Sequence, residues 1–309
     1  MRSLLIIVLS AFVISSCAKL NPDYPFVPNG YFSYTSEQIA LRPVSSVIYE
    51  NNHSIFFAST NGSVIYYDGN VWKNIADESD RSVNEILKTR DNILWKATNK
   101  DLSYYKNGAW TNVLQNADVI DIEAEGISNL WILTSDTVNQ LLHYNNQRID
   151  TIKQANNLNR IAGIATDSDH KLWIASANNG LFYTIDGNEI IKFQNPYLLQ
   201  TEFTSIATDE NTVWLGDNEG VIYKVCNNEV NIVRTGLNQS ITKLYATYDN
   251  SLWAIVSQTG LIRYKGSEIQ LLSKQDYNFP SNNIITISQT DASSLLITFD
   301  NGEIFNLAF

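Results

Sequence analysis

One stretch of the sequence decides the fold: Ile164–Tyr183, which reads IATDSDHKLWIASANNGLFY. Its centre is the pair Leu172-Trp173, which is followed by small and apolar residues and then by an Asn-Gly turn. The same pair, or an apolar substitute for it, returns at steps of 36 to 43 residues. A period of about forty residues indicates stacked supersecondary units. The occurrences are Ile55-Phe56, Leu94-Trp95, Leu130-Trp131, Leu172-Trp173, Val213-Trp214, Leu252-Trp253 and Leu295-Leu296.

Each unit carries the signals of four short antiparallel strands. Two apolar anchors precede the second residue of the pair by twelve and nine positions, or by eleven and eight in the unit of Trp214. After the pair come two turns rich in Asn, Asp and Gly, residues that accept the positive φ of tight hairpins. The anchors are Val44 and Val47, Val83 and Ile86, Val119 and Ile122, Ile161 and Ile164, Phe203 and Ile206, Ile241 and Leu244, and Ile284 and Ile287.

These units predict an all-β fold: a seven-bladed β-propeller of four-stranded antiparallel blades over residues 31–309. A single sheet cannot bury both of its faces by itself, so we expect each Trp of the repeat to pack between neighbouring blades. Burial of one such aromatic side chain contributes roughly 2 to 3 kcal/mol. The alternative arrangement is an open or six-bladed ring.

The two ends of the chain are predicted to share the last blade. The final unit stops at Phe309, where its third strand ends. Asn29-Gly30-Tyr31-Phe32 resembles Asn107-Gly108-Ala109-Trp110, which opens a fourth strand in another unit. The first strand after the N-terminal linker is therefore expected to complete the last blade. Closure of this kind removes exposed sheet edges, so we expect a monomeric propeller.

The N-terminus predicts an envelope lipoprotein. Met1 and Arg2 are followed by an apolar stretch, residues 4–14, and then by Ser15-Ser16-Cys17. The stretch is shorter than the roughly 20 residues of a membrane-spanning helix and fits a signal peptide. We predict a signal peptide at 1–16, a lipidated Cys17 with a Pro-containing linker at 17–30, and a location in the bacterial cell envelope. The anchor would lie in the outer membrane, facing the periplasm or the surface. The alternative is an ordinary signal peptide with an incidental Cys.

With the repeat in view, Ile164–Tyr183 resembles the two-component regulator propeller repeat, as does the stretch from Phe279 to Ile287. The resemblance extends over residues 31–309. In that family such repeats build the periplasmic ligand-sensing half of hybrid histidine kinases, which also carry tandem propellers, an immunoglobulin-like domain, a membrane span and a kinase. The resemblance therefore implies a propeller, and we expect a free-standing, lipid-anchored relative for which signalling does not carry over.

No catalytic, metal or cofactor motif is found in the sequence. His53 and His170 lie in turns before a Leu-Trp pair and His143 in a predicted third strand, so the histidines lack metal-ligand spacing. There is no nucleophile elbow, phosphate loop or paired-Cys metal site. The formal net charge of −11 argues against nucleic acid as a partner. We therefore predict no catalytic residues, no metal and no cofactor.

Polar residues between the two anchors are the candidate ligand-binding groups. In propellers the first strand of each blade lines the central channel, so side chains between the anchors are expected at the channel mouth. Aromatic residues of two loops would add to the same rim, with Phe279 beside them. The alternative is that these groups only hydrate the channel and pair with one another. The candidates are Ser46, Asn84, Glu85, Asp121, Ser205, Lys243, Thr286, Tyr197 and Tyr277.

The function predicted from these features is a binding or scaffold propeller without catalysis of its own. It would recognise a glycan, a peptide or an envelope protein at the channel mouth. One alternative is a propeller enzyme of the polysaccharide lyase or hydrolase type. Such a lyase needs a His, Tyr or Lys near a carboxylate-neutralising group, and among the channel candidates only Lys243 qualifies. The other alternative is a subunit of an envelope assembly. Fold alone does not decide between them.

Overall fold

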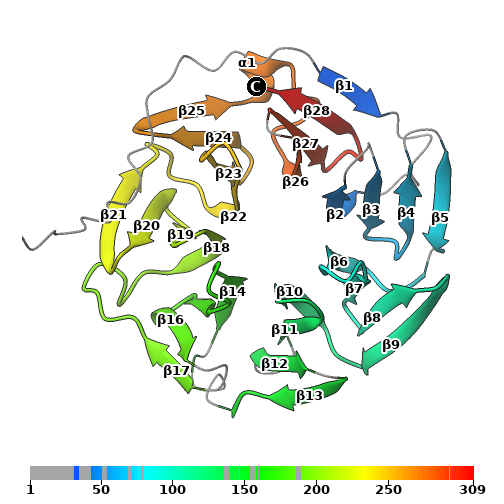
Figure 1. The fold of residues 1–309 in the computed structure, drawn as a ribbon. Helices are drawn as coiled ribbons and strands as arrows, with labels where there is room; N and C mark the ends of the chain where they lie inside the picture. The colour runs from blue at the N-terminus through cyan, green and yellow to red at the C-terminus, as the bar shows by residue number, and fades with distance from the viewer. Residues whose placement is uncertain are drawn as a thin grey trace, which may run out of the picture.

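The computed structural model describes residues 31–34, 43–50, 54–68, 71–77, 79–135, 139–145, 147–153, 158, 160–185, 189–291 and 293–309. Within them the chain forms seven four-stranded antiparallel sheets, arranged radially about one axis (Figure 1). The predicted seven-bladed β-propeller is therefore confirmed. Cys17, the predicted signal peptide, the linker and His53 lie outside the described residues.

Six blades run from the axis outward in chain order, and in blade 7 the outermost strand is the N-terminal β1. Blade 1 consists of β2 (Val44–Tyr49), β3 (Ile55–Ser59), β4 (Val64–Tyr67) and β5 (Trp72–Ala76). Blade 2 consists of β6 (Val83–Lys88), β7 (Leu94–Thr98), β8 (Asp101–Lys106) and β9 (Ala109–Gln115). Blade 3 consists of β10 (Val119–Glu125), β11 (Asn129–Ser135), β12 (Asn139–Asn145) and β13 (Arg148–Thr151). Blade 4 consists of β14 (Ile161–Thr166), β15 (Leu172–Ser176), β16 (Gly180–Ile185) and β17 (Glu189–Lys192). Blade 5 consists of β18 (Phe203–Asp209), β19 (Thr212–Asp217), β20 (Val221–Cys226) and β21 (Glu229–Arg234). Blade 6 consists of β22 (Ile241–Ala246), β23 (Leu252–Val256), β24 (Gly260–Lys265) and β25 (Glu268–Leu272). Blade 7 consists of β26 (Ile284–Asp291), β27 (Ser294–Phe299), β28 (Ile304–Ala308) and β1 (Tyr31–Tyr34). The short helix α1 (Lys274–Tyr277) lies between blades 6 and 7 in the chain.

The first strand of every blade carries a β-bulge directly after its first anchor. In β6 the register shifts between Val83 and Glu85. Side chains of a regular strand alternate between its faces, so Val83 and Ile86, three residues apart, would point in opposite directions. The extra residue of the bulge brings both anchors into one buried cluster and re-aims the residue between them. The three-residue spacing of the anchors is thus the sequence signature of the bulge.

The repeated Trp packs each blade against the next one, as predicted. Trp131 of blade 3 is fully buried against Ile161 and Ile164 of blade 4. Trp95, Trp173, Trp214 and Trp253 occupy the same place in their blades. Where the Trp is replaced, Phe56 and Leu296 pack at the interfaces that follow blades 1 and 7. Every interface between neighbouring blades therefore holds an apolar cluster of its own.

The N-terminal strand closes the ring. β1 pairs antiparallel with β28, from Tyr31 opposite Leu307 to Tyr34 opposite Ile304. Figure 1 shows β1 on the outside of β28, in the blade whose other three strands come from the C-terminal end of the chain. The predicted completion of the last blade by the N-terminal strand is confirmed.

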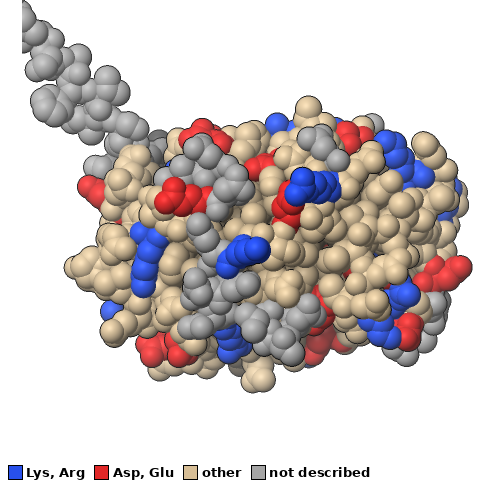
Figure 2. Space-filling model, turned by 90° about the horizontal axis from the view of Figure 1, so that it is seen from below, with Lys and Arg blue, Asp and Glu red and all other residues tan. Residues whose placement is uncertain are grey.

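The surface shows no segregation of charge on the side seen in Figure 2. Lys and Arg side chains lie interspersed with Asp and Glu side chains there. Among the described residues, no helix has the length and apolar character needed to cross a membrane.

Candidate functional site

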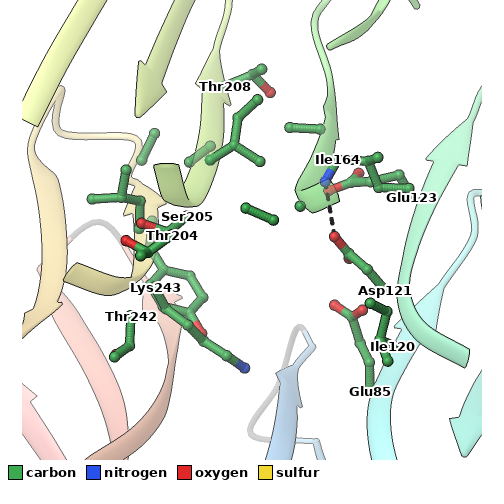
Figure 3. Close-up of a pocket in the computed structure, with 18 of the residues that line it drawn as sticks. Glu85, Ile120, Asp121, Glu123, Ile164, Thr204, Ser205, Thr208, Thr242 and Lys243 are labelled. Atoms are coloured by element: carbon green, nitrogen blue, oxygen red, sulfur yellow. Dashed lines mark hydrogen bonds between the residues drawn. The ribbon is translucent and has the colours of Figure 1, made fainter. Parts of the chain in front are cut away.

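The candidate site is a cavity of about 480 Å³ in the centre of the ring. This volume lies within the range of roughly 300 to 1,000 Å³ that is typical of small-molecule sites. Five consecutive blades line it, each through its first strand: β6, β10, β14, β18 and β22 (Figure 3). The lining side chains that bear charges or hydroxyl groups are Glu85, Asp121, Glu123, Thr204, Ser205, Thr208, Thr242, Lys243 and Tyr245.

Three of the predicted residues fasten neighbouring blades together. The bulge aims each of them at the backbone N–H of the second anchor of the following blade, which donates a hydrogen bond to it. Ile86 donates to Ser46 Oγ at 3.2 Å. Ile122 donates to Glu85 Oε2 at 3.0 Å and Ile164 to Asp121 Oδ2 at 3.0 Å. Each carboxylate thus satisfies a backbone donor with one oxygen and keeps the other for the cavity.

The remaining predicted polar residues divide between wall and cavity. Asn84 lines the cavity, but its Nδ2 donates to Asp118 Oδ1 at 3.2 Å and to the Val119 carbonyl at 2.8 Å. Ser205 lines it and donates to the Ile241 carbonyl at 2.9 Å. Ser46 and Thr286 are buried in the wall and are not part of the lining. The hydrogen bonds of these four residues therefore mainly stabilise the ring. This agrees with the alternative that the polar groups between the anchors pair within the protein instead of binding a ligand.

Glu85 and Asp121 form a carboxyl pair across the interface of blades 2 and 3. Their carboxyl groups point toward each other in Figure 3. Burial raises the pKa of Glu85 well above its usual value, and the charge of Asp121 raises it further. Burial also raises the pKa of Asp121, although hydrogen bonds from the Ile164 amide and with Glu85 act in the opposite direction.

Glu123 and Tyr245 belong to the site and were missed in the sequence. Burial raises the pKa of Glu123 well above its usual value, and the charge of Asp121 adds to the effect. Beyond the bulge the strand alternates regularly, so the residue two positions after each channel residue faces the channel too. This alternation brings Glu123 beside Asp121 on β10 and Tyr245 beside Lys243 on β22. Counting every second residue from the bulge along each first strand would have identified Glu123 and Tyr245 from the sequence.

Lys243 faces the carboxyl groups from the opposite wall (Figure 3). Its pKa is raised, above all by the interaction with Tyr245 and then by the charges of Glu85 and Asp121, although burial opposes this. Among the described residues, Lys243 Nζ has no carboxylate within the 4.0 Å of an ion pair. Tyr245 Oη in turn bonds to Thr286 Oγ1 at 2.7 Å, which anchors this wall to blade 7. The cavity therefore places one cation opposite a carboxyl cluster without direct pairing.

The predicted aromatic rim is only partly present. Tyr197 is 62% exposed in the segment between β17 and β18. Tyr277 is half-buried on α1, where its hydroxyl accepts a hydrogen bond from Gln270 Nε2. Phe279 is buried rather than exposed, with ring centroids 5.6 Å from Phe299 and 5.5 Å from Phe305. The loop folds inward and adds Phe279 to the core between blades 6 and 7, so the expectation of a rim aromatic there is wrong.

The described histidines have local structural roles. His143 Nε2 lies 2.6 Å from Glu125 Oε2, and the His143 ring stacks on Trp131 at 4.1 Å between centroids. His170 occupies a turn with φ of 62°. No group of three or more His, Cys, Asp or Glu within the described ranges has a geometry that could hold a metal ion.

The channel carboxyls predict an unusual dependence of stability on pH. Because their pKa values are raised, the folded state binds these protons more tightly than the unfolded chain does, so stability falls as pH rises above about 4.5. Glu123→Gln removes one such group and should raise the melting temperature at pH 8, with a difference that shrinks toward pH 4.5. Thermal unfolding followed by circular dichroism between pH 4.5 and 8 measures it.

Asp249 supplies a control of opposite sign. Burial opposes its ionisation, but hydrogen bonds from Thr247, Ser251 and Arg263 and the charge of Arg263 lower its pKa to about 2. Its contribution to stability is therefore complete above its usual value of 3.8 and is lost only as pH falls toward 2. Asp249→Asn should accordingly lower the melting temperature at pH 8. A Glu123→Gln protein that is less stable than the wild type at pH 8 would contradict the raised pKa of Glu123.

The comparisons with known proteins concern the fold. No family model and no curated protein matches the chain. Among solved structures, the extracellular domain of the hybrid two-component system BT4673 from B. thetaiotaomicron is similar, with a TM-score of 0.69 and 19% identity, over 86% of this chain and 38% of that one. Virginiamycin B lyase from Staphylococcus aureus, solved with quinupristin, has a TM-score of 0.74 and 13% identity over 91% and 100%.

A third similar structure is PorZ, an essential surface component of the type-IX secretion system of Porphyromonas gingivalis. Its TM-score is 0.67 at 17% identity, over 86% of this chain and 46% of that one. The chain thus spans less than half the length of PorZ and of the two-component protein. At these identities the likeness shows the fold alone. The resemblance to two-component regulator propellers is confirmed at that level: this chain has the propeller fold that it shares with the extracellular domain of a two-component system.

Proposed function

We propose that this protein is a binding propeller of the bacterial cell envelope that holds a small polar ligand, or the charged end of a peptide, in its channel cavity. It carries out no reaction of its own. One observation supports this most: Glu85 and Asp121 lie on one wall of the channel cavity and Lys243 lies on the other. Opposed charged groups around a small cavity orient a ligand by its own charges.

The energetics of the cavity favour binding over a purely structural role. A hydroxyl group is enough to fasten two blades, because Ser46 does so between blades 1 and 2. Glu85 and Asp121 do the same work with carboxyl groups that burial disfavours in their charged form. Perturbed titratable groups that converge in a cavity are characteristic of functional sites.

The proposed location rests on the N-terminal sequence. Ser15-Ser16-Cys17 after a short apolar stretch is similar to a lipobox, and we propose that acyl chains on Cys17 anchor the propeller to the outer membrane. The extracellular domain of a two-component protein and a bacterial surface component are among the similar structures, which agrees with an envelope location. The aqueous side of the anchor, periplasm or surface, is left to experiment.

The binding proposal predicts that neutralising the charges of the cavity abolishes ligand binding. The purified protein is screened on glycan and peptide arrays, and each hit is titrated against Glu85→Gln, Asp121→Asn and Lys243→Met. Gln and Asn keep an acceptor for the backbone N–H of the next blade, so these variants should fold where alanine would break the fastening. Loss of a charge-assisted hydrogen bond of roughly 2 kcal/mol weakens binding by more than tenfold.

The matched control is Lys106→Ala, which removes an exposed Lys at the end of β8. It should leave the affinity for every hit unchanged. Hits that bind all three channel variants as tightly as the wild type would overturn the proposed site.

A second candidate, a propeller enzyme, is favoured by the Glu85–Asp121 pair. Two neighbouring carboxyl groups with raised pKa values, of which that of Glu85 is raised well above its usual value, resemble the carboxyl pairs of general acid–base catalysis. Lys243 would then neutralise an acidic group of a substrate. Incubation of each array hit with the protein, followed by mass spectrometry, separates the candidates. A cleaved hit whose cleavage requires Glu85 would support the enzyme, and an unchanged hit supports binding.

A further inference from the structure

We infer that the ligand of the channel is a small molecule carrying two amino groups and one carboxylate, of the class of the basic amino acids. The inference rests on the proposed function, because it assigns a ligand class to the same cavity. Three features support it: the excess of acids over bases in the lining, their placement on opposite walls, and the volume.

The lining contains more acids than bases. Glu85, Asp121 and Glu123 contribute three carboxyl groups, and Lys243 contributes one ammonium group. The first strands of blades 4 and 5 line the cavity with apolar residues, glycine and hydroxyl groups only. A ligand that has amino groups for the acidic wall and a carboxylate for Lys243 complements this lining, because burial disfavours the charged form of each of these groups unless an opposite charge lies beside it.

The two walls offer different partners to a ligand. Glu85 and Asp121 each use one oxygen to accept a hydrogen bond from a backbone N–H. An ammonium group of the ligand between them can donate to the remaining oxygens in place of the contact between the two carboxyl groups. Glu123 lies further along β10 and can take a second amino group. On the opposite wall, Lys243 is partly buried and aimed into the cavity without an ion-pair partner among the described carboxylates. A carboxylate of the ligand supplies that partner.

The volume limits the size of the ligand. A cavity of about 480 Å³ accepts an amino acid together with several water molecules. A neutral sugar offers these groups hydrogen bonds but no opposite charge, so the cavity favours a charged ligand over it.

The test is isothermal titration calorimetry of the full protein with L-lysine and two partial analogues. Cadaverine is lysine without its carboxylate, and 6-aminohexanoic acid is lysine without its α-amino group. We expect L-lysine to bind, and both analogues to bind at least tenfold more weakly. This comparison needs no variant, so it does not depend on how any substitution folds. Absence of L-lysine binding, or equal affinity for all three compounds, would overturn the inference.

Two variants then locate each group of the ligand. Lys243→Met should weaken binding of L-lysine at least tenfold and should not weaken binding of cadaverine, because cadaverine has no carboxylate to lose a partner and its ammonium groups are repelled by Lys243. Glu85→Gln should weaken both compounds. Equal losses for both compounds in Lys243→Met would contradict the assigned orientation.

Failure of this inference is distinguishable from failure of the proposed function. If L-lysine does not bind but a neutral array hit binds and depends on Lys243 or Glu85, the channel is a binding site and the ligand class is wrong. If the array hits are indifferent to every channel variant, the channel is not the binding site and both proposals fail.

Discussion

Trp131→Ala should lower the free energy of unfolding by about 3 to 5 kcal/mol, the range of large-to-small changes of buried aromatics. The Trp131 side chain is fully buried between blades 3 and 4, where it contacts anchors of the following blade and stacks on His143. Alanine leaves a cavity that the flat sheets on either side cannot fill. For a chain of this size the loss corresponds to a fall of roughly 10 °C in the melting temperature. Urea and thermal unfolding measure it.

The matched control is Trp72→Ala, the same chemical change in an outer strand. Trp72 is half-buried on β5 and stacks on Tyr67 at 4.5 Å between centroids. Its loss should cost clearly less than that of Trp131, because Trp72 is only partly buried where it packs against the cluster between blades 7 and 1. Equal losses for the two substitutions would show that the repeated Trp position is not what holds the blades together.

Deletion of residues 29 to 41 should open the ring. The deletion removes β1 and leaves β28, its pairing partner over four residue pairs, as an exposed edge. At about 0.5 to 1.5 kcal/mol for each backbone hydrogen bond, roughly 2 to 6 kcal/mol of stability is lost. An unpaired edge also recruits strands from other molecules, so self-association should appear. Thermal unfolding and analytical ultracentrifugation measure the two effects.

The control for this deletion is a chain that lacks only residues 18 to 28, the linker before β1. It should keep the melting temperature of the wild type and remain monomeric. A protein without residues 29 to 41 that is equally heat-resistant and monomeric would contradict closure by the N-terminal strand.

The blade count and the closure were predictable because the repeat is dense and its signals agree. Each Leu-Trp pair, with anchors before it and turns after it, carries the same information, so Phe56 and Leu296 could be recognised as substitutes. The bulge was also visible in the three-residue spacing of the anchors, which a regular strand does not explain. Phe279 was misjudged because loop residues have no period from which burial can be read.

The site was predictable only in part, for a geometric reason. Position between the anchors identified Glu85, Asp121 and Lys243, which the bulge turns into the channel. It also identified Ser46 and Thr286, which occupy equivalent positions in blades 1 and 7 but lie in the wall. Which blades border the open part of the channel depends on side-chain packing around the whole ring, and a repeat that treats all blades alike does not contain that information.

Amide hydrogen exchange at residues 304–308 tests closure of the ring most directly, and the channel cavity and every proposal about it depend on that closure. The amides of β28 should exchange as slowly in the intact protein as those of β24, the corresponding strand of blade 6, whose outer partner β25 follows it in the chain. Exchange at β28 as fast as at an exposed sheet edge would show that the N-terminal strand does not complete blade 7.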